Sequence, residues 1–154
     1  MFSQNNADTA RKTIWTNHFQ FTTVVQSHTG FKSLYSGKNS LSDSVEIASI
    51  TATATLFLGH KLWKGAALYF NPELSGGRGL SSAIDVAGAL NGESYRVGAT
   101  SPVIFIARGY LQQHIGFGNT TYENVEEEVN QIADAIPTNR ITNSAGKFAI
   151  GDFL

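Results

Sequence analysis

The feature that most constrains folding is a long run of alternating residues that carries no charge. Residues 51–58 read TATATLFL, and no charged side chain occurs between Glu46 and Lys61. Successive side chains of a β-strand point to opposite faces of a sheet, whereas a helix distributes them around its axis. The alternation therefore predicts a strand with one apolar face and one hydroxyl-rich face.

The residues that follow this run predict a β-hairpin. Trp63-Lys64-Gly65 has the composition of a tight turn, and a glycine at such a position permits the backbone conformations that short hairpin turns require. Leu68 and Phe70 then resume the apolar face, opposite Tyr69 and Asn71. Two alternating strands joined by a short turn are therefore expected over residues 47–71.

Other segments complete a five-stranded pattern. Alternation recurs at residues 15–26, 102–116 and 140–153. Pro72 has no backbone N–H to donate, so we expect regular pairing of the second hairpin strand to end near it. The polar, aperiodic residues 1–13 predict an unstructured lead-in to a single domain over residues 14–154.

One segment switches from a period of two to a helical period. Apolar residues at helical spacing occur within residues 121–136, at Val125, Val129, Ile132, Ala133 and Ile136. Glutamates gather in the early turns, where a helix dipole favours negative charge. The spacing predicts one short amphipathic helix, which Pro137 ends.

Composition and motifs argue against several classes of function. The net charge of -1 gives no reason to expect a nucleic-acid partner, and the absence of cysteine excludes thiolate chemistry. The four histidines lack metal-ligand spacing, YSGKNS at 35–40 lacks the pattern of a phosphate-binding loop, and no serine-nucleophile motif occurs. We therefore expect no enzyme, no metal site and no cofactor.

Two β architectures fit the alternation. A soluble sandwich would pack its apolar face against a second sheet, whereas an outer-membrane barrel would turn that face to lipid and its polar face to a wet interior. Only 15% of the residues are charged, against about 25% in typical soluble domains. The alternating runs are also long enough to span a bilayer, which takes about 9–11 residues of tilted strand.

The connections and the aromatic residues favour the barrel slightly. Long connections at 27–46 and 75–101 flank the short turn at 63–66, as in outer-membrane barrels. Trp15, Trp63, Tyr69 and Phe117 stand near strand ends, where interfacial aromatics are enriched. The residues taken alone leave both architectures open.

Four blocks of the sequence resemble the carbohydrate-selective outer-membrane porins of the OprB type. They are SGKNSLS (36–42), TLFLGHKLWKGAALYFNPEL (55–74), GGRGLSSAIDVAGALNGESYRVG (76–98) and GKFAIGDF (146–153). The likeness extends from about Trp15 to the last residue, and the second and third blocks are its most specific parts. It implies an all-β, antiparallel transmembrane β-barrel, of which this chain would supply about five strands of a roughly sixteen-stranded whole, with one short helix.

The resemblance also implies a function. Such a porin lets sugars diffuse passively across a bacterial outer membrane, catalyses no reaction and requires no cofactor. Its partners would be sugars, outer-membrane lipid and, for the full-length porin, further copies of itself. Residues 1–13 lack the features of a signal peptide, so we expect either a cytoplasmic protein or a mature or truncated form. The resemblance covers only the beginning of such a porin and implies an N-terminal fragment. A soluble carbohydrate-binding β-sandwich remains the alternative.

Alternation and resemblance together indicate which residues would line the channel. The hydroxyl-rich face carries Thr51, Thr53 and Thr55. The residues expected to contact sugars are Arg108, Glu73, Asn71, Tyr69, Tyr110 and Gln112. Arg108 and Glu73 are the charged members of this set, and charged and aromatic side chains set the selectivity of pores generally. The loop at 75–101 is expected to fold inward and narrow the channel.

Overall fold

The computed structural model describes residues 13–35, 37, 40–82, 100–149 and 151, and this part of the chain is all-β. Its elements are β1 (Trp15–His28), β2 (Glu46–Trp63), β3 (Ala66–Gly77), the 3-10 turn η1 (Leu80–Ser82), β4 (Val103–Gly116), β5 (Tyr122–Val125), β6 (Asp134–Pro137) and β7 (Arg140–Lys147). Within these described ranges, no helix is both long and apolar enough to cross a membrane. The predicted lead-in, except for Thr13, lies outside the described residues.

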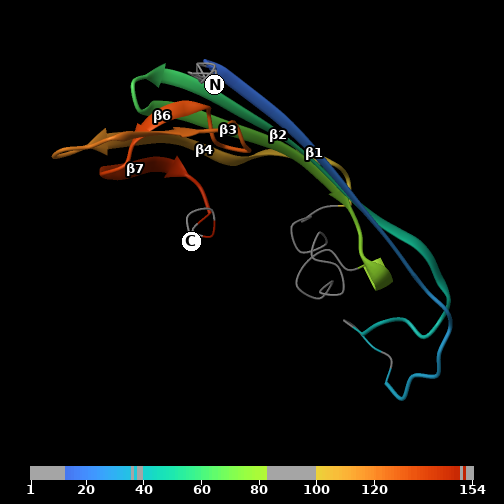
Figure 1. Ribbon diagram of the computed structural model, residues 1–154. Helices are drawn as coiled ribbons and strands as arrows, with labels where there is room; N and C mark the ends of the chain where they lie inside the picture. Colours follow the sequence, from blue (N-terminus) through green and yellow to red (C-terminus); the bar gives the residue numbers. More distant parts are fainter. Residues whose placement is uncertain (1–12, 36, 38–39, 83–99, 150, 152–154) are drawn as a thin grey trace, which may run out of the picture. The chain divides into compact units, whose positions relative to one another are not determined.

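Five strands form one sheet in the order β1-β2-β3-β4-β7, with β1 and β7 at its edges (Figure 1). β2 and β3 are joined by the two-residue turn Lys64-Gly65, in which Gly65 has a φ of +74°. β4 and β7 are antiparallel, in a register that runs from Gly109 opposite Lys147 to Gly116 opposite Arg140. The five predicted strands and the predicted hairpin are therefore confirmed, although the structure shows the fifth, predicted over 140–153, as a strand only over Arg140–Lys147.

The predicted helix at 121–136 is wrong. This segment holds β5 and β6, which pair antiparallel from Tyr122 opposite Pro137 to Val125 opposite Asp134. Asn130, between the two strands, has a left-handed φ of +58°, which a continuous right-handed helix does not tolerate. Ile132 is buried by tertiary packing, and such packing can outweigh a local preference for a helix.

The predicted end of pairing at Pro72 is also wrong, because β3 continues through this residue to Gly77. A proline removes one donor from a ladder but leaves the hydrogen-bonding groups of its neighbours in place. The extra residues carry Glu73 and Ser75 onto the buried side of the strand, where they are 1% and 4% exposed.

The chain divides into two compact units. Unit 1 consists of Met1–His18, Phe57–Asn71 and Ala107–Leu154, and unit 2 consists of Phe19–Leu56 and Pro72–Ile106. Unit 1 thus contains the β2–β3 turn and the β5–β6 pair, and unit 2 contains the connections that follow β1 and β3.

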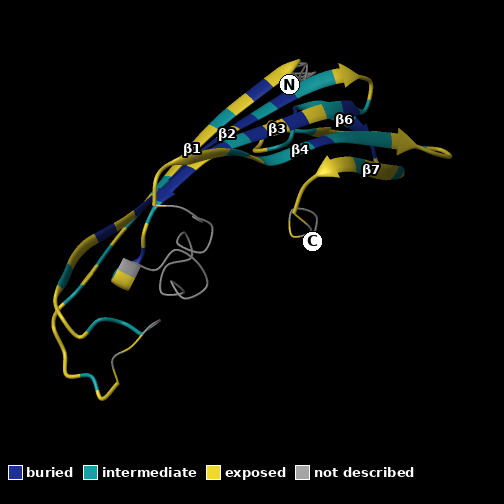
Figure 2. Cartoon of the chain, turned by 180° about the vertical axis from the view of Figure 1, so that it is seen from behind, coloured by how far each residue is buried: buried dark blue, intermediate teal, exposed yellow. Residues whose placement is uncertain are grey.

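Burial alternates along the strands in the sense opposite to that of an ordinary soluble sheet. In β2, Thr51 is fully buried and Thr53 and Thr55 are nearly so, whereas Ile50 is 45% exposed. β1 shows the same sense, since Thr16 is buried and Phe19 is 67% exposed. The alternating buried and exposed bands are visible along β2 and β3 in Figure 2. The sheet covers its polar side chains and presents its apolar ones outward.

Candidate functional site

The polar face is the set of strand residues whose polar or phenolic side chains are buried. It comprises Thr16, Ser49, Thr51, Thr53, Thr55, Tyr69, Asn71, Glu73, Ser75 and Tyr110. In unit 2, the Thr55 hydroxyl donates a hydrogen bond to Glu73 Oε2 at 2.9 Å. A buried carboxylate is costly unless hydrogen bonds replace its water. The hydroxyl-rich strand β2 meets part of this need for Glu73, the acid predicted to contact sugar.

The apolar face is the opposite side of the strands and is exposed over most of its length. Its large side chains include Trp15, Phe19, Phe21, Val25, Ile50, Leu56, Leu62, Leu68, Phe70, Leu74, Val103 and Ile115. Soluble monomers rarely expose contiguous apolar surface of this extent. Large apolar side chains are therefore a prominent part of the exposed surface on this side of the strands.

Both tryptophans stand at the same end of β1 and β2. The Trp15 ring stacks on the His60 ring with centroids 3.9 Å apart, and the backbone N–H of Lys61 donates to the Ile14 carbonyl at 2.8 Å. Trp63 Nε1 donates to Gln113 Oε1 at 2.7 Å. Trp15 and Trp63 remain 61% and 57% exposed, and Trp63 combines an apolar ring with a polar contact.

The predicted sugar-contact residues of unit 1 occupy different environments. Tyr69 and Tyr110 pack together with ring centroids 5.1 Å apart, and Ile132 completes a buried cluster with them. Arg108 and Gln112 are half-buried. Asn71 is 0% exposed, and neither atom of its side-chain amide has a hydrogen-bond partner among the described residues. Because a buried unpaired amide is destabilising, Asn71 is the least satisfied residue of the predicted set.

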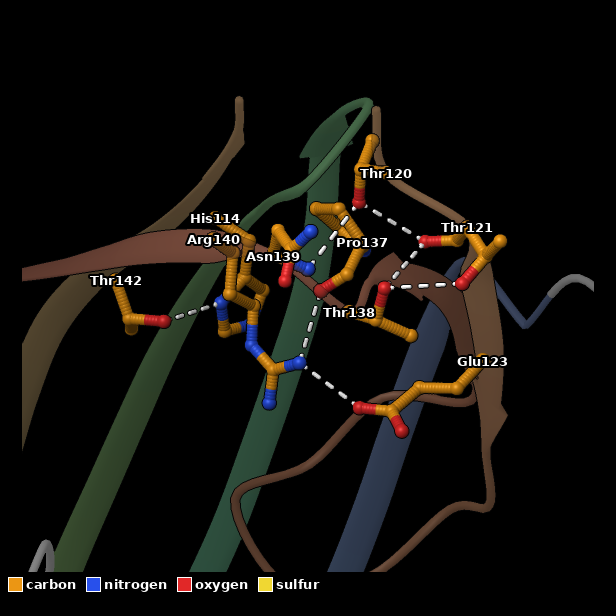
Figure 3. Close-up of polar contacts among 9 residues, drawn as sticks. All are labelled: His114, Thr120, Thr121, Glu123, Pro137, Thr138, Asn139, Arg140 and Thr142. Carbon is orange, nitrogen blue, oxygen red and sulfur yellow. Dashed lines mark hydrogen bonds and ion pairs between the residues drawn. The ribbon is translucent and has the colours of Figure 1, made fainter. Parts of the chain in front are cut away.

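The connection between β4 and β7, residues 117–139, is called the insert, and its two ends are joined by a polar stem (Figure 3). The backbone N–H of Thr138 donates to the Thr121 carbonyl at 2.9 Å, and the two threonine hydroxyls lie 3.0 Å apart. The backbone N–H of Asn139 donates to the Thr120 hydroxyl at 3.2 Å. These bonds hold the ends of the insert side by side, and its strands β5 and β6 pair antiparallel between them.

Arg140 fixes the base of this stem. Its Nη1 donates to Glu123 Oε1 at 2.8 Å and to the Pro137 carbonyl at 2.9 Å (Figure 3). On the adjacent strand, His114 Nδ1 lies 2.8 Å from the Thr142 hydroxyl. One guanidinium therefore links β7 to both strands of the insert.

The middle of the insert contacts the polar side of β1 and β2. Thr16 Oγ1 donates to Glu127 Oε1 at 2.5 Å, and His18 Nε2 lies 3.5 Å from the same oxygen. Lys61 Nζ lies 2.5 Å from Asp134 Oδ2. Sequence reasoning missed these contacts because it assigned the segment to a short amphipathic helix. The Gly118-Asn119 pair and the Pro137-Thr138-Asn139 run were the available signals, since both are typical of turns.

In unit 2, Glu46 joins the start of β2 to η1. Its carboxylate accepts from the Ser81 backbone N–H at 2.6 Å and from the Ser81 hydroxyl at 2.9 Å. The Ser42 backbone N–H donates to the same hydroxyl at 2.8 Å. The loop predicted to narrow the channel, 75–101, begins here, but its residues 83–99 lie outside the described part.

The candidate site is rich in hydrogen-bonding groups. In the part of the chain that the structure describes, no group of three or more His, Cys, Asp or Glu side chains could hold a metal ion. Hydroxyls, a carboxylate and an amide instead follow neighbouring strands on one face. No protein-family model, curated protein or solved structure matches this chain.

Proposed function

We propose that this chain forms part of the wall of an outer-membrane porin through which sugars diffuse passively. The observation that carries the proposal is the inverted sheet, which buries Thr51, Thr53 and Thr55 and exposes Ile50, Phe19 and their neighbours. A strand wall between lipid and an aqueous pore likewise carries apolar side chains on its outer face and polar side chains on its inner face. A soluble β-sandwich would bury its apolar face instead.

Strand length supports the same environment. β1, β2, β3 and β4 contain 14, 18, 12 and 14 residues, and a tilted strand crosses the hydrocarbon core in about 9–11 residues. Between Glu46 and Lys61, β2 carries no charge that hydrocarbon would have to accept. The exposed Trp15 and Trp63 then mark one membrane interface, where amphipathic rings are stabilised.

The polar face supplies the chemistry for sugar passage. Sugar hydroxyls both donate and accept hydrogen bonds, and a lumen of hydroxyl, amide and carboxylate groups can replace part of their hydration. The likeness of residues 55–74 and 76–98 to carbohydrate-selective porins supports sugars as the solute class. Arg108 and Glu73 are the charged groups proposed to contact them.

A pore needs more strands than this sheet contains. Bacterial outer-membrane barrels use about 8 strands or more, and an open edge would leave backbone groups unpaired in hydrocarbon. The edges of the described sheet, β1 and β7, are therefore proposed to pair with further strands of a larger barrel. Only the protein as it assembles in the membrane would therefore form a pore.

Sugar flux tests the proposal directly. Proteoliposomes made with the membrane-assembled protein are expected to swell in an isosmotic neutral monosaccharide, because the sugar enters together with water. Arg108→Ala should lower the swelling rate because it removes a lumen donor, whereas Arg78→Ala, at an exposed position outside the strands, should leave it unchanged. A protein that is folded and monomeric in plain buffer, without detergent, would favour the soluble binding module.

Tryptophan depth provides a second prediction. The chain has two tryptophans, Trp15 and Trp63, which the contacts around His60 and Lys61 place at one end of the sheet. Bromine atoms near the lipid headgroups should quench single-tryptophan variants of both kinds to a similar extent, and bromine at the acyl-chain ends should quench both weakly. Strong quenching of only one tryptophan, or maximal quenching at the bilayer centre, would contradict the assigned membrane position.

A further inference from the structure

The insert differs from the turn at the same end of the sheet in both length and position. The β2–β3 turn needs only Lys64-Gly65, whereas the β4–β7 connection runs from 117 to 139. Both begin at the same end, since the His114 backbone N–H donates to the Gly65 carbonyl at 2.7 Å and Lys64 Nζ lies 4.6 Å from the centroid of the Tyr122 ring. A connection of this length therefore calls for a physical explanation.

The insert is packed onto the polar face rather than extended into solvent. Glu127 reaches Thr16 on β1, and Asp134 reaches Lys61 on β2. Ile132 is 5% exposed and lies against Tyr69 and Tyr110, on β3 and β4. In Figure 1, β6 accordingly runs over the strands β2 and β3. Contacts therefore connect the insert to four successive strands.

We propose that the insert, residues 117–139, is the constriction of the channel. This inference rests on the proposed function, because only in a porin is the polar face the wall of a passage. An element that lies on that wall reduces the cross-section open to solute by its own thickness. It enters from the end of the sheet that carries the short Lys64-Gly65 turn, which is the periplasmic end by the loop asymmetry of outer-membrane barrels.

The contacts also indicate a fixed constriction. The stem at Thr121 and Thr138 holds the base of the insert, and the Lys61–Asp134 pair and the Ile132 cluster hold its far side. An element bonded at its base and at its far side has little freedom to swing. The insert therefore sets a constant size limit, with Tyr69 and Tyr110 as the surface on which it rests.

Cross-linking tests the position of the insert independently of transport. The chain contains no cysteine, so a Thr16→Cys, Glu127→Cys double variant carries the only thiols. A short bifunctional thiol reagent should link this pair in isolated membranes. The matched control pairs Trp15→Cys with Glu127→Cys, because residue 15 points to the opposite face of the same strand, and it should not be linked.

A second double-cysteine variant keeps the test decisive if the first variant fails to fold. Lys61→Cys with Asp134→Cys should be linked, and Leu62→Cys with Asp134→Cys should not, since Leu62 is on the exposed apolar face. If both direct pairs assemble in the membrane and neither is linked, the insert does not lie on the polar face and the proposal is overturned.

Sugar flux through variants that lose the Lys61–Asp134 ion pair tests the constriction itself. Lys61→Ala and Asp134→Ala each remove one side of an anchor, and each is expected to raise the flux of a neutral oligosaccharide severalfold while changing monosaccharide flux little. The exchanged pair Lys61→Asp, Asp134→Lys should restore the original size limit. Unchanged oligosaccharide flux in both single variants would overturn the constriction and leave the porin assignment intact. Absence of sugar flux in the unmodified protein would instead reject the porin assignment, and with it the constriction.

Discussion

Leu56→Arg is expected to destabilise the membrane-assembled protein by about 2–4 kcal/mol, the cost of a cationic side chain at the midplane on the lipid face of a barrel. Leu56 lies within the uncharged part of β2, on the exposed apolar face. If that face met water, an arginine at this position would be nearly neutral, because surface substitutions typically change stability by less than about 0.5 kcal/mol. The size of the destabilisation therefore distinguishes lipid from water as the environment of the apolar face.

Leu62→Arg is the matched control. It lies on the same face of the same strand with almost the same exposure, 40% against 38%, but one residue from the end of β2. Near an interface the cost should fall to about 0–1 kcal/mol. Urea titration in liposomes, followed by tryptophan emission, measures both variants. Equal effects at the two positions, large or small, would contradict the depth assigned to β2.

Ile132→Ala is expected to cost about 2–5 kcal/mol, the usual range for truncating a well-buried isoleucine. Ile132 is the only aliphatic side chain in the buried cluster with Tyr69 and Tyr110 within the described ranges. Its truncation removes the apolar contact that holds the middle of the insert, so the loss should fall on the docking of the insert rather than on the five-stranded sheet. Protease cleavage between residues 126 and 133 should then become rapid while the strands stay protected.

Val129→Ala serves as the control, because Val129 lies in the same insert but is 52% exposed. It should leave both the protease resistance of the insert and oligosaccharide flux close to those of the unmodified protein. Limited proteolysis of membrane-assembled protein, read by mass spectrometry, compares the two variants. Equal cleavage in both would indicate that the Ile132 cluster does not hold the insert.

The strands were predictable because their alternation has a physical cause that acts locally. Each strand separates two different environments, and this requires a period of two whatever the rest of the chain does. The same alternation indicated that Tyr69, Asn71, Glu73 and Tyr110 belong to one face, and the structure buries all four. The alternation of side chains along a strand does not show what covers each face, so the packing of Ile132 onto Tyr69 and Tyr110 was not predicted.

The insert was not predictable because its decisive contacts are remote. Thr16 and Glu127 are 111 positions apart in the sequence, and no local pattern indicates that they meet. The apolar spacing at Val125, Val129 and Ile132 is real, but a hairpin buries Ile132 and leaves Val129 exposed, whereas a helix would have buried both. A short apolar pattern is ambiguous until its partner surface is known.

The remote contact between Thr16 and Glu127 also has a consequence for the order of assembly. Closing so long a loop costs conformational entropy before any contact is gained, and contacts of high sequence separation generally slow folding. The binding surface for the insert is complete only after β1, β2, β3 and β4 have paired. Docking of residues 117–139 is therefore expected as a late kinetic phase, which a fluorophore on the insert would report after strand formation is finished.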